Sequence, residues 1–277
     1  MILLSTGVIL ALIFIWFSVP FSPLKAAFNR QNEQLKKAAP LYSGEVFTKE
    51  DFSNFPPAVQ KYIASCGYIG TPKMNFVKML YRNVKFSQQV NGAKLKINYT
   101  QYNYAKQPAR LALIQSRLFG IPFEGYDYYS GGTGGMKGVI AKCFTLFNQT
   151  GSSMDKACLV TYLAESLFLP SSLLQNRIQF EEISDFAVKA TIFYNGQSAG
   201  GIFTFNNEYE MISFTTNDRA VIGTDGKTEY IPWTAACGGY KTNELGIKQP
   251  TVFKAIWNYP EKDFVYFDGT ISRIEYE

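Results

Sequence analysis

The sequence predicts an α+β domain built on one large, curved, half-barrel-like antiparallel β-sheet. Two or three helices are expected on its concave face, and a membrane helix at its N-terminus. Aromatic residues make up 16% of the chain, and these side chains suit the pleated surface of strands. Short alternating segments recur between turn signals, which is typical of antiparallel neighbours. We expect roughly ten or more strands, and a sheet of that width curls or closes.

Residues 2–19 predict a membrane helix because they carry no charge. As a helix this segment spans about 27 Å, close to the roughly 30 Å hydrocarbon core of a bilayer. We expect an uncleaved anchor. A cleaved signal segment is the alternative, although no Lys or Arg precedes the apolar run and residues 24–27 make a poor cleavage site. Basic residues follow the run, which favours a cytoplasmic domain, but the sequence leaves the side of the membrane open.

Three parts are predicted along the chain. Residues 1–24 form the membrane anchor or signal segment, residues 25–47 a polar tether, and residues 48–277 a single antiparallel α+β domain. The tether is expected because residues 29–47 are polar and follow no regular pattern. The sequence does not determine the oligomeric state.

Two helices are predicted inside the domain. Pro57 suits the first position of one helix, and Gly67 stops it. The other helix extends over Gly151–Pro170, with Ser152 and Asp155 as a capping-box start and the proline as its end. Because this second helix interrupts the strands, we expect it to cover the concave face and connect the two halves of the sheet.

A first series of strands is predicted between the two helices, over residues 76–87, 94–104, 111–119, 123–129 and 137–147. Asn91-Gly92 is a hairpin signal. The alternation slips by one residue between Tyr99 and Tyr102, which predicts a β-bulge. Residues 130–135 are glycine-rich, but they lack the Lys-Ser/Thr of a phosphate-binding loop and enter a strand, so we interpret them as a flexible β-turn or a bulge.

A second series of strands follows the central helix, over residues 186–194, 201–205, 209–216, 228–235, 251–257 and 264–276. Its turn signals are Asn195-Gly196, Asn206-Asn207 and Asp225-Gly226. Turns at this spacing again indicate antiparallel pairing.

Several chemistries are excluded by composition. The chain contains no histidine, which rules out Ser-His-Asp and Cys-His catalysis and His-ligated metal sites within it. None of the four cysteines forms a CxxC pair, so we expect no zinc ribbon. We predict no metal and no cofactor. Free buried thiols are expected, and one disulfide stays open as an alternative if the domain is extracytoplasmic. The net charge of +5 comes from scattered basic residues, so we expect no nucleic-acid partner.

Several short motifs resemble a family of uncharacterised bacterial membrane-anchored proteins, a domain of unknown function. They lie in order over about residues 50–277: Phe55 to Tyr62 with Gly67, Gly134-Gly135-Met136, Tyr162-Leu163-Ala164-Glu165 with Pro170, Asp218-Arg219, Pro232-Trp233, Tyr240 and Trp257. Phe180 stands where the family often has Trp. The resemblance implies a curved sheet similar to the half-barrels of bacterial lipoprotein carriers, with no established activity. It marks Glu165, Arg219, Trp233, Tyr240 and Trp257 as positions of interest.

Three classes of function fit these observations. The first is a membrane-anchored binding module whose half-barrel holds a lipid or another apolar ligand. Its hypothetical ligand-binding residues are Tyr162, Glu165, Arg219, Trp233, Tyr240 and Trp257. The second is a structural or protein-interaction module of the cell envelope. The third, the least favoured, is a histidine-independent enzyme that uses Glu165 with Arg219 as its expected partner; we assign no catalytic residue.

Overall fold

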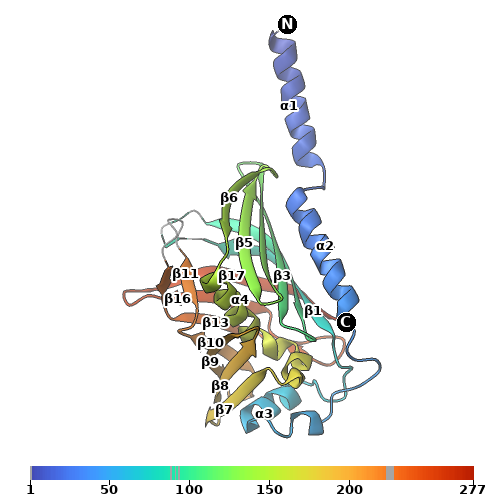
Figure 1. The fold of residues 1–277 in the computed structure, drawn as a ribbon, viewed down its shortest axis with the longest axis vertical. Coiled ribbons are helices and arrows are strands. Elements are labelled where there is room, and N and C mark those ends of the chain that lie inside the picture. The colour runs from blue at the N-terminus through green and yellow to red at the C-terminus, as the bar shows by residue number, and fades with distance from the viewer. Residues whose placement is uncertain (1, 88, 91, 93, 223–227) are drawn as a thin grey trace.

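The computed structural model describes residues 2–87, 89–90, 92, 94–222 and 228–277. Its centre is one 13-stranded antiparallel sheet in the order β6-β5-β4-β3-β2-β1-β17-β16-β13-β10-β9-β8-β7 (Figure 1). The predicted fold class, a large antiparallel sheet with helices and an apolar N-terminal helix, is confirmed. The predicted turn at Asp225-Gly226, and Asn91 of the other predicted hairpin, lie outside the described residues.

Each half of the sheet is a run of antiparallel neighbours. The first half contains β1 (Phe76–Phe86), β2 (Leu95–Tyr104), β3 (Ala109–Leu118), β4 (Ile121–Ser130), β5 (Thr133–Ile140) and β6 (Phe144–Gln149). The second contains β7 (Ile178–Ser184), β8 (Ala187–Tyr194), β9 (Gln197–Phe205), β10 (Met211–Thr216), β13 (Trp233–Gly238), β16 (Val252–Asn258) and β17 (Asp263–Tyr276). Two small ribbons add β11 (Ala220–Ile222) with β12 (Thr228–Tyr230) and β14 (Lys241–Thr242) with β15 (Lys248–Gln249). The halves meet where β1 pairs with β17.

Helix α4 (Ser152–Ala164) connects the two edges of the sheet, because it follows β6 and precedes β7. It packs against β4, β5, β8 and β9 inside the curved sheet (Figure 1). Two short 3₁₀ helices, η2 (Ser166–Phe168) and η3 (Pro170–Gln175), complete the crossing. Helix α3 (Pro57–Ser65), preceded by η1 (Glu50–Phe52), lies near β7 and β8. The predicted helix at Pro57 is confirmed.

The predicted start and end of the central helix are wrong. Gly151 is the N-cap, and no side chain caps the first turn. Asp155 instead accepts a hydrogen bond from the backbone N–H of Gly134 at 2.7 Å, so its carboxylate ties the helix to β5. The helix ends at Ala164, one residue before Glu165. A tertiary contact has therefore displaced the local capping box.

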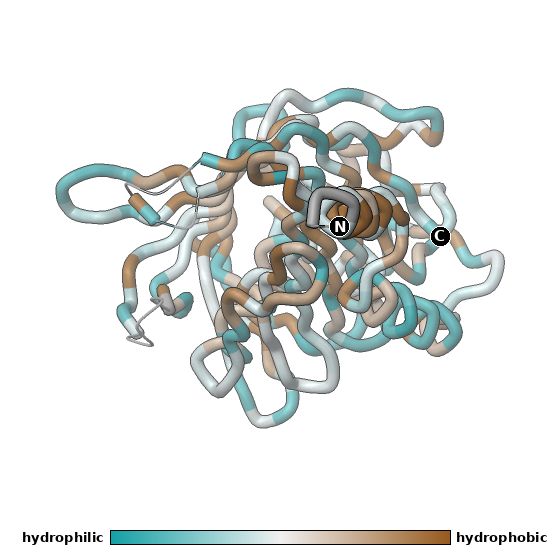
Figure 2. Tube along the Cα trace, turned by 90° about the horizontal axis from the view of Figure 1, so that it is seen from above, coloured by the Kyte–Doolittle hydropathy of each residue, from teal (hydrophilic) through white to brown (hydrophobic). Residues whose placement is uncertain are grey.

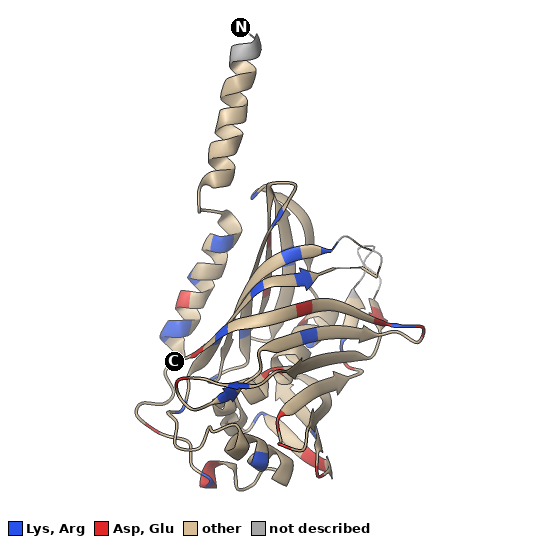
Figure 3. Cartoon of the chain, turned by 180° about the vertical axis from the view of Figure 1, so that it is seen from behind, with Lys and Arg blue, Asp and Glu red and all other residues tan. Residues whose placement is uncertain are grey.

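The prediction of an irregular tether is wrong for residues 25–38, because residues Pro23–Ala38 form helix α2. Residues 39–47 are irregular, as predicted. Ser22 caps it by accepting a hydrogen bond from the N–H of Lys25 at 3.1 Å. The buried side chains Leu24, Phe28 and Leu35 recur at helical spacing and pack on the outer face of β2, β3 and β4. Helix α2 carries charged residues along its length, whereas α1 carries none (Figure 3).

The covering helix explains the slip in alternation along β2. No register shift occurs between β2 and β3, so the predicted bulge is wrong. The irregularity lies in β1, between Tyr81 and Val84. Along β2, Tyr102 and Tyr104 belong to the hydrophobic cluster under α2, while Gln101 points to the opposite, concave face. The strand is buried on both faces there, so its apolar side chains no longer mark the concave face.

The predicted strand over residues 137–147 is two strands joined by a tight turn. Ala141 and Lys142 both have positive φ values, of 54° and 66°. Lys142 donates hydrogen bonds from Nζ to the carbonyl oxygens of Trp16 and Val19, at 2.7 and 2.6 Å. This distant contact accompanies a turn for which the sequence offers no Gly or Asn signal. The predicted strand over 228–235 likewise divides into β12 and β13, with Pro232 between them.

Helix α1 (Ile2–Ser18) projects away from the domain (Figure 1). Its side chains are apolar and exposed along most of its length, and viewed from above it is coloured as hydrophobic (Figure 2). Phe14, for example, is 73% exposed. By length and composition this part of the chain is able to cross a membrane, a property that it shares with signal segments.

Candidate functional site

A cavity of about 420 Å³ lies between α4 and the concave face of the sheet. Strands from both halves and helix α4 contribute to its wall. The apolar part of the wall includes Phe86, Val90, Met136, Phe147, Phe253, Ala255 and Phe264. Four of the six residues predicted for the site, Glu165, Arg219, Trp233 and Trp257, line this cavity. The curvature of the sheet thus leaves space that the abundant aromatic side chains do not fill.

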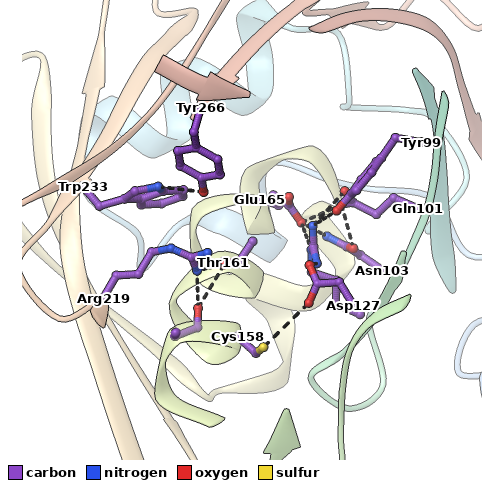
Figure 4. Close-up of polar contacts among 12 residues, drawn as sticks. Tyr99, Gln101, Asn103, Asp127, Cys158, Thr161, Glu165, Arg219, Trp233 and Tyr266 are labelled. Carbon is purple, nitrogen blue, oxygen red and sulfur yellow. Dashed lines mark hydrogen bonds and ion pairs between the residues drawn. The ribbon is translucent and has the colours of Figure 1, made fainter. Parts of the chain in front are cut away.

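Arg110 is the centre of a polar cluster at one side of the cavity. Its partners Tyr99, Gln101, Asp127 and Glu165 lie together in Figure 4. From β3, its Nε donates to Oε2 of Glu165 at 2.9 Å and its Nη1 to Oδ2 of Asp127 at 2.6 Å. Its Nη2 donates to the hydroxyl of Tyr99 at 2.6 Å and to Oε1 of Gln101 at 3.2 Å. Arg110 is only 4% exposed and Glu165 only 2%. Two carboxylates therefore share one buried guanidinium.

The carboxylate of Glu165 is held by side chains from two strands. Besides Arg110, Gln101 and Asn103 donate to Oε2 from their amide nitrogens, at 2.6 and 2.8 Å. A carboxylate buried to this degree needs such donors, because an unpaired charge in the interior is costly. Since Glu165 directly follows the last residue of α4, the cluster fixes that end of the helix to the sheet.

Burial and charge act in opposite directions on Arg110. Burial favours the neutral guanidine, but the negative charges of Glu165 and Asp127 outweigh it, so the pKa of Arg110 is raised well above its usual value. Burial also raises the pKa of Tyr99, which stays a neutral phenol. The arginine is consequently a permanent cation.

Arg219 does not pair with Glu165, so that predicted pairing is wrong. Its Nη1 donates to the carbonyl oxygen of Ala157 at 2.7 Å and to the hydroxyl of Thr161, both on α4. The guanidinium carbon lies 4.8 Å from the ring centre of Trp233 and 5.6 Å from that of Trp257. These are cation–π distances. Its Nε is buried and has no hydrogen-bond partner among the described residues.

The aromatic side chains around Arg219 form a second cluster, across α4 from Tyr99, Gln101 and Asp127 (Figure 4). The indole Nε1 of Trp233 donates to the hydroxyl of Tyr266 at 3.1 Å. Tyr266 stacks on Trp257 at an interplanar angle of 22° and a centroid distance of 5.8 Å. The three rings form one wall of the cavity, and Arg219 connects that wall to the helix.

Tyr162 and Tyr240, the other two predicted residues, lie outside the cavity wall. The Tyr162 hydroxyl donates to the carbonyl oxygen of Tyr104 at 2.8 Å and is buried. The Tyr240 hydroxyl donates to the carbonyl oxygen of Met211 at 2.9 Å. Each hydroxyl satisfies a backbone carbonyl, so both residues act in packing and turn formation.

Sequence reasoning missed most of the residues around Arg110. Gln101 and Asn103 alternate on β2 with two tyrosines, and that alternation is the signal that could have identified a polar patch on one face. Arg110 and Asp127 gave no comparable signal, because they belong to different strands and meet only when β3 pairs with β4.

All four cysteines are free thiols. Cys66 and Cys158 are buried, Cys237 is partly buried and Cys143 is exposed. Burial raises the pKa of Cys66 and of Cys237 to about 12, and it raises that of Cys158 as well. In the part of the chain that the structure describes, no three Cys, Asp or Glu side chains are grouped as metal ligands.

Two solved structures resemble the fold. One is a domain named for outer membrane lipoprotein sorting from Vibrio parahaemolyticus, with a TM-score of 0.38, 10% identity, and coverage of 79% of this chain and 91% of that one. The other is a DUF1329 family protein from Desulfovibrio piger, with a TM-score of 0.37, 8% identity, and coverage of 84% and 94%. No curated protein matches the chain. Residues 45–269 match the family of unknown function DUF6544, and the chain therefore belongs to that family.

Proposed function

We propose that the domain binds a lipid or another apolar ligand in the cavity under α4. The cavity itself carries this proposal, because its wall consists mostly of aromatic and aliphatic side chains around about 420 Å³. Small-molecule sites measure roughly 300–1,000 Å³ and have this kind of wall. Apolar atoms that face open space lack contacts on one side, and an acyl chain would supply those contacts.

The two arginines of the cavity hold helix α4 in place, so that the cavity has a rigid cover and one open side. Arg110 holds the C-terminal end of α4 through Glu165, and Arg219 holds the middle of the helix through Thr161. Both guanidinium groups thus bind α4, which makes the helix a rigid cover. The ligand enters at the turn after β1, where Val90 lines the cavity and is 59% exposed. Helix α1 keeps the domain at the membrane, where such a ligand is abundant.

Retained lipid tests the proposal. The full-length protein is purified and extracted with organic solvent, and the extract is analysed by mass spectrometry. Ala255, which is 5% exposed and lines the cavity, is replaced in the variant Ala255→Trp so that the indole occupies the space. Ala27→Trp, at an exposed position of α2, is the matched control.

We expect lipid in stoichiometric amount with the wild type and with the control. Ala255→Trp should retain about tenfold less, the equivalent of 1.4 kcal/mol of binding free energy. A wild-type extract without lipid, or equal retention by both variants, would refute the proposal. A stoichiometric protein crosslink in membranes together with lipid-free protein would favour the interaction module instead.

A further inference from the structure

We propose that the domain has a second membrane contact, separate from α1, formed by four exposed apolar side chains at one end of the sheet. These side chains, here called the rim, are Phe21, Phe119, Phe144 and Leu146. We infer that the rim lies in the interface of an anionic bilayer. The proposal is independent of any ligand in the cavity.

The topology of the sheet brings the rim together. The turn between β3 and β4 contains Phe119, and Phe144 begins the strand after the turn between β5 and β6. Consecutive antiparallel strands place alternate turns at the same end of a sheet. The turn after β5 also contacts the start of β4, because the N–H of Ala141 donates to the carbonyl oxygen of Pro122 at 2.8 Å. Phe21 lies three residues after Ser18, the last residue of α1.

This end of the sheet is attached to the base of α1. The indole Nε1 of Trp16 donates to the carbonyl oxygen of Ala141 at 3.0 Å. Lys142 donates back to the carbonyl oxygens of Trp16 and Val19, and its ammonium lies 5.6 Å from the Trp16 ring centre. A tryptophan at the end of an apolar span typically lies at the membrane interface. The turn that it contacts therefore lies at interface depth.

The four side chains of the rim are unusually exposed for large apolar residues. Phe119 is 96% exposed, Phe144 66%, Leu146 56% and Phe21 54%. Phe119 also has a φ of 50°, in the left-handed region where a bulky residue is strained. A strained turn that presents a whole aromatic ring to the outside indicates a surface with a function. Apolar side chains beside a membrane helix gain from entering the bilayer interface.

The excess of basic residues in the strands next to the rim indicates which kind of bilayer the rim contacts. Residues 76–149 contain ten Lys or Arg and two Asp or Glu, whereas residues 150–277 contain ten and sixteen. Lys94, Lys96 and Arg117 are exposed at the rim end of β2 and β3. Each basic residue near an anionic lipid surface contributes about 1 kcal/mol of attraction. The surface that binds the rim is therefore a bilayer that contains anionic lipid.

A fluorescent label on the native thiol Cys143 tests the rim directly, because this exposed residue lies in the turn beside Phe144. The full-length protein is reconstituted into phosphatidylcholine vesicles with or without phosphatidylglycerol, with a spin-labelled quencher lipid in both leaflets. The matched control is Cys143→Ser with Leu245→Cys. Leu245 is 55% exposed and precedes Gly246, whose carbonyl lies against Gly67 just after α3. Helix α3 lies at the opposite end of the molecule from α1 (Figure 1).

We expect lipid quenching of the Cys143 label at least about twofold greater than that of the control label, and greater still with phosphatidylglycerol. The double variant Phe119→Glu/Phe144→Glu should abolish this excess while the protein still floats with the vesicles, because α1 remains. Equal quenching of both labels would overturn the proposal, as would an excess that the double variant leaves unchanged. Neither result depends on whether the cavity binds lipid.

Discussion

Replacement of Glu165 by glutamine tests whether the Arg110 cluster fixes α4. Three nitrogen donors, from Arg110, Gln101 and Asn103, converge on one carboxylate oxygen within 2.9 Å. The amide of glutamine has the same size but no charge, and one of its two terminal atoms is itself a donor. The substitution therefore weakens every one of these bonds without creating a cavity.

The expected loss of unfolding free energy depends on the ion pair that Arg110 keeps in the variant. Breaking a buried ion pair costs about 3–5 kcal/mol when it leaves an unpaired charge. Arg110 retains Asp127 at 2.6 Å, so we expect a loss near the lower limit, about 3 kcal/mol. For a domain of this size, each kcal/mol lowers the melting temperature by roughly 2–4 °C, which gives about 6–12 °C. Addition of Asp127→Asn removes the remaining carboxylate, and the double variant should lose more than the sum of the single losses.

Urea unfolding of the full-length protein in micelles measures these changes, since the emission of the buried Trp233 reports the folded state. The control is Glu181→Gln. Glu181 forms an ion pair with Lys189 at 3.2 Å, but the two side chains are 71% and 54% exposed, so we expect a loss below about 1 kcal/mol. If Glu165→Gln destabilises the domain no more than this control, the cluster does not fix α4.

Three further predictions concern other contacts. Arg219→Lys should lower the free energy of unfolding by about 1–2 kcal/mol, because lysine loses the stacking on Trp233 and the fork geometry of arginine; an unchanged urea midpoint would contradict this. At pH 8 a maleimide should modify Cys143 alone in the folded protein and all four thiols in urea, because burial raises the pKa of the other three; mass spectrometry counts the adducts, and a second rapid adduct would disprove the burial. Lys78 donates a 2.8 Å hydrogen bond to Glu275, which lowers the pKa of that carboxyl from its ordinary value of 4.5. The pair therefore stabilises the fold at pH values above 4.5, and this contribution is lost as the pH falls through the lowered pKa. In the variant Glu275→Gln, the free energy of unfolding should therefore fall less steeply as the pH is lowered below 4.5. An identical fall in the wild type and the variant would refute the contribution of this pair.

Local signals in the sequence identified the elements that depend on local chemistry. Pro57 and Gly67 mark the ends of α3, and Asn195-Gly196 forms the tight turn before β9 with positive φ at both residues. Alternation along the strands predicted the antiparallel sheet for the same reason, since each strand carries its own pattern.

The predictions failed where distant contacts decide the structure. Three apolar residues in a polar segment form the buried stripe of α2 only because the outer face of β3 and β4 receives them. The turn at Ala141 is held by Trp16, 125 residues away. The partner of Glu165 is Arg110 rather than Arg219, and that choice depends on which strands pair and how deeply each guanidinium is buried. No local pattern encodes such choices.

The pairing of β1 with β17 at the centre of the sheet has a consequence for how the chain folds. Val77 pairs with Tyr276, so the middle of the sheet closes a loop of almost the whole domain. Loop closure of that length costs entropy before any contact repays it, and sheets dominated by distant pairings fold slowly. During synthesis β1 has to wait for β17, which follows every other strand of the sheet in chain order, and until then one edge of β1 is unpaired. An unpaired strand edge is a template for aggregation, so a nascent domain of this topology depends on protection of that edge until β17 has been made.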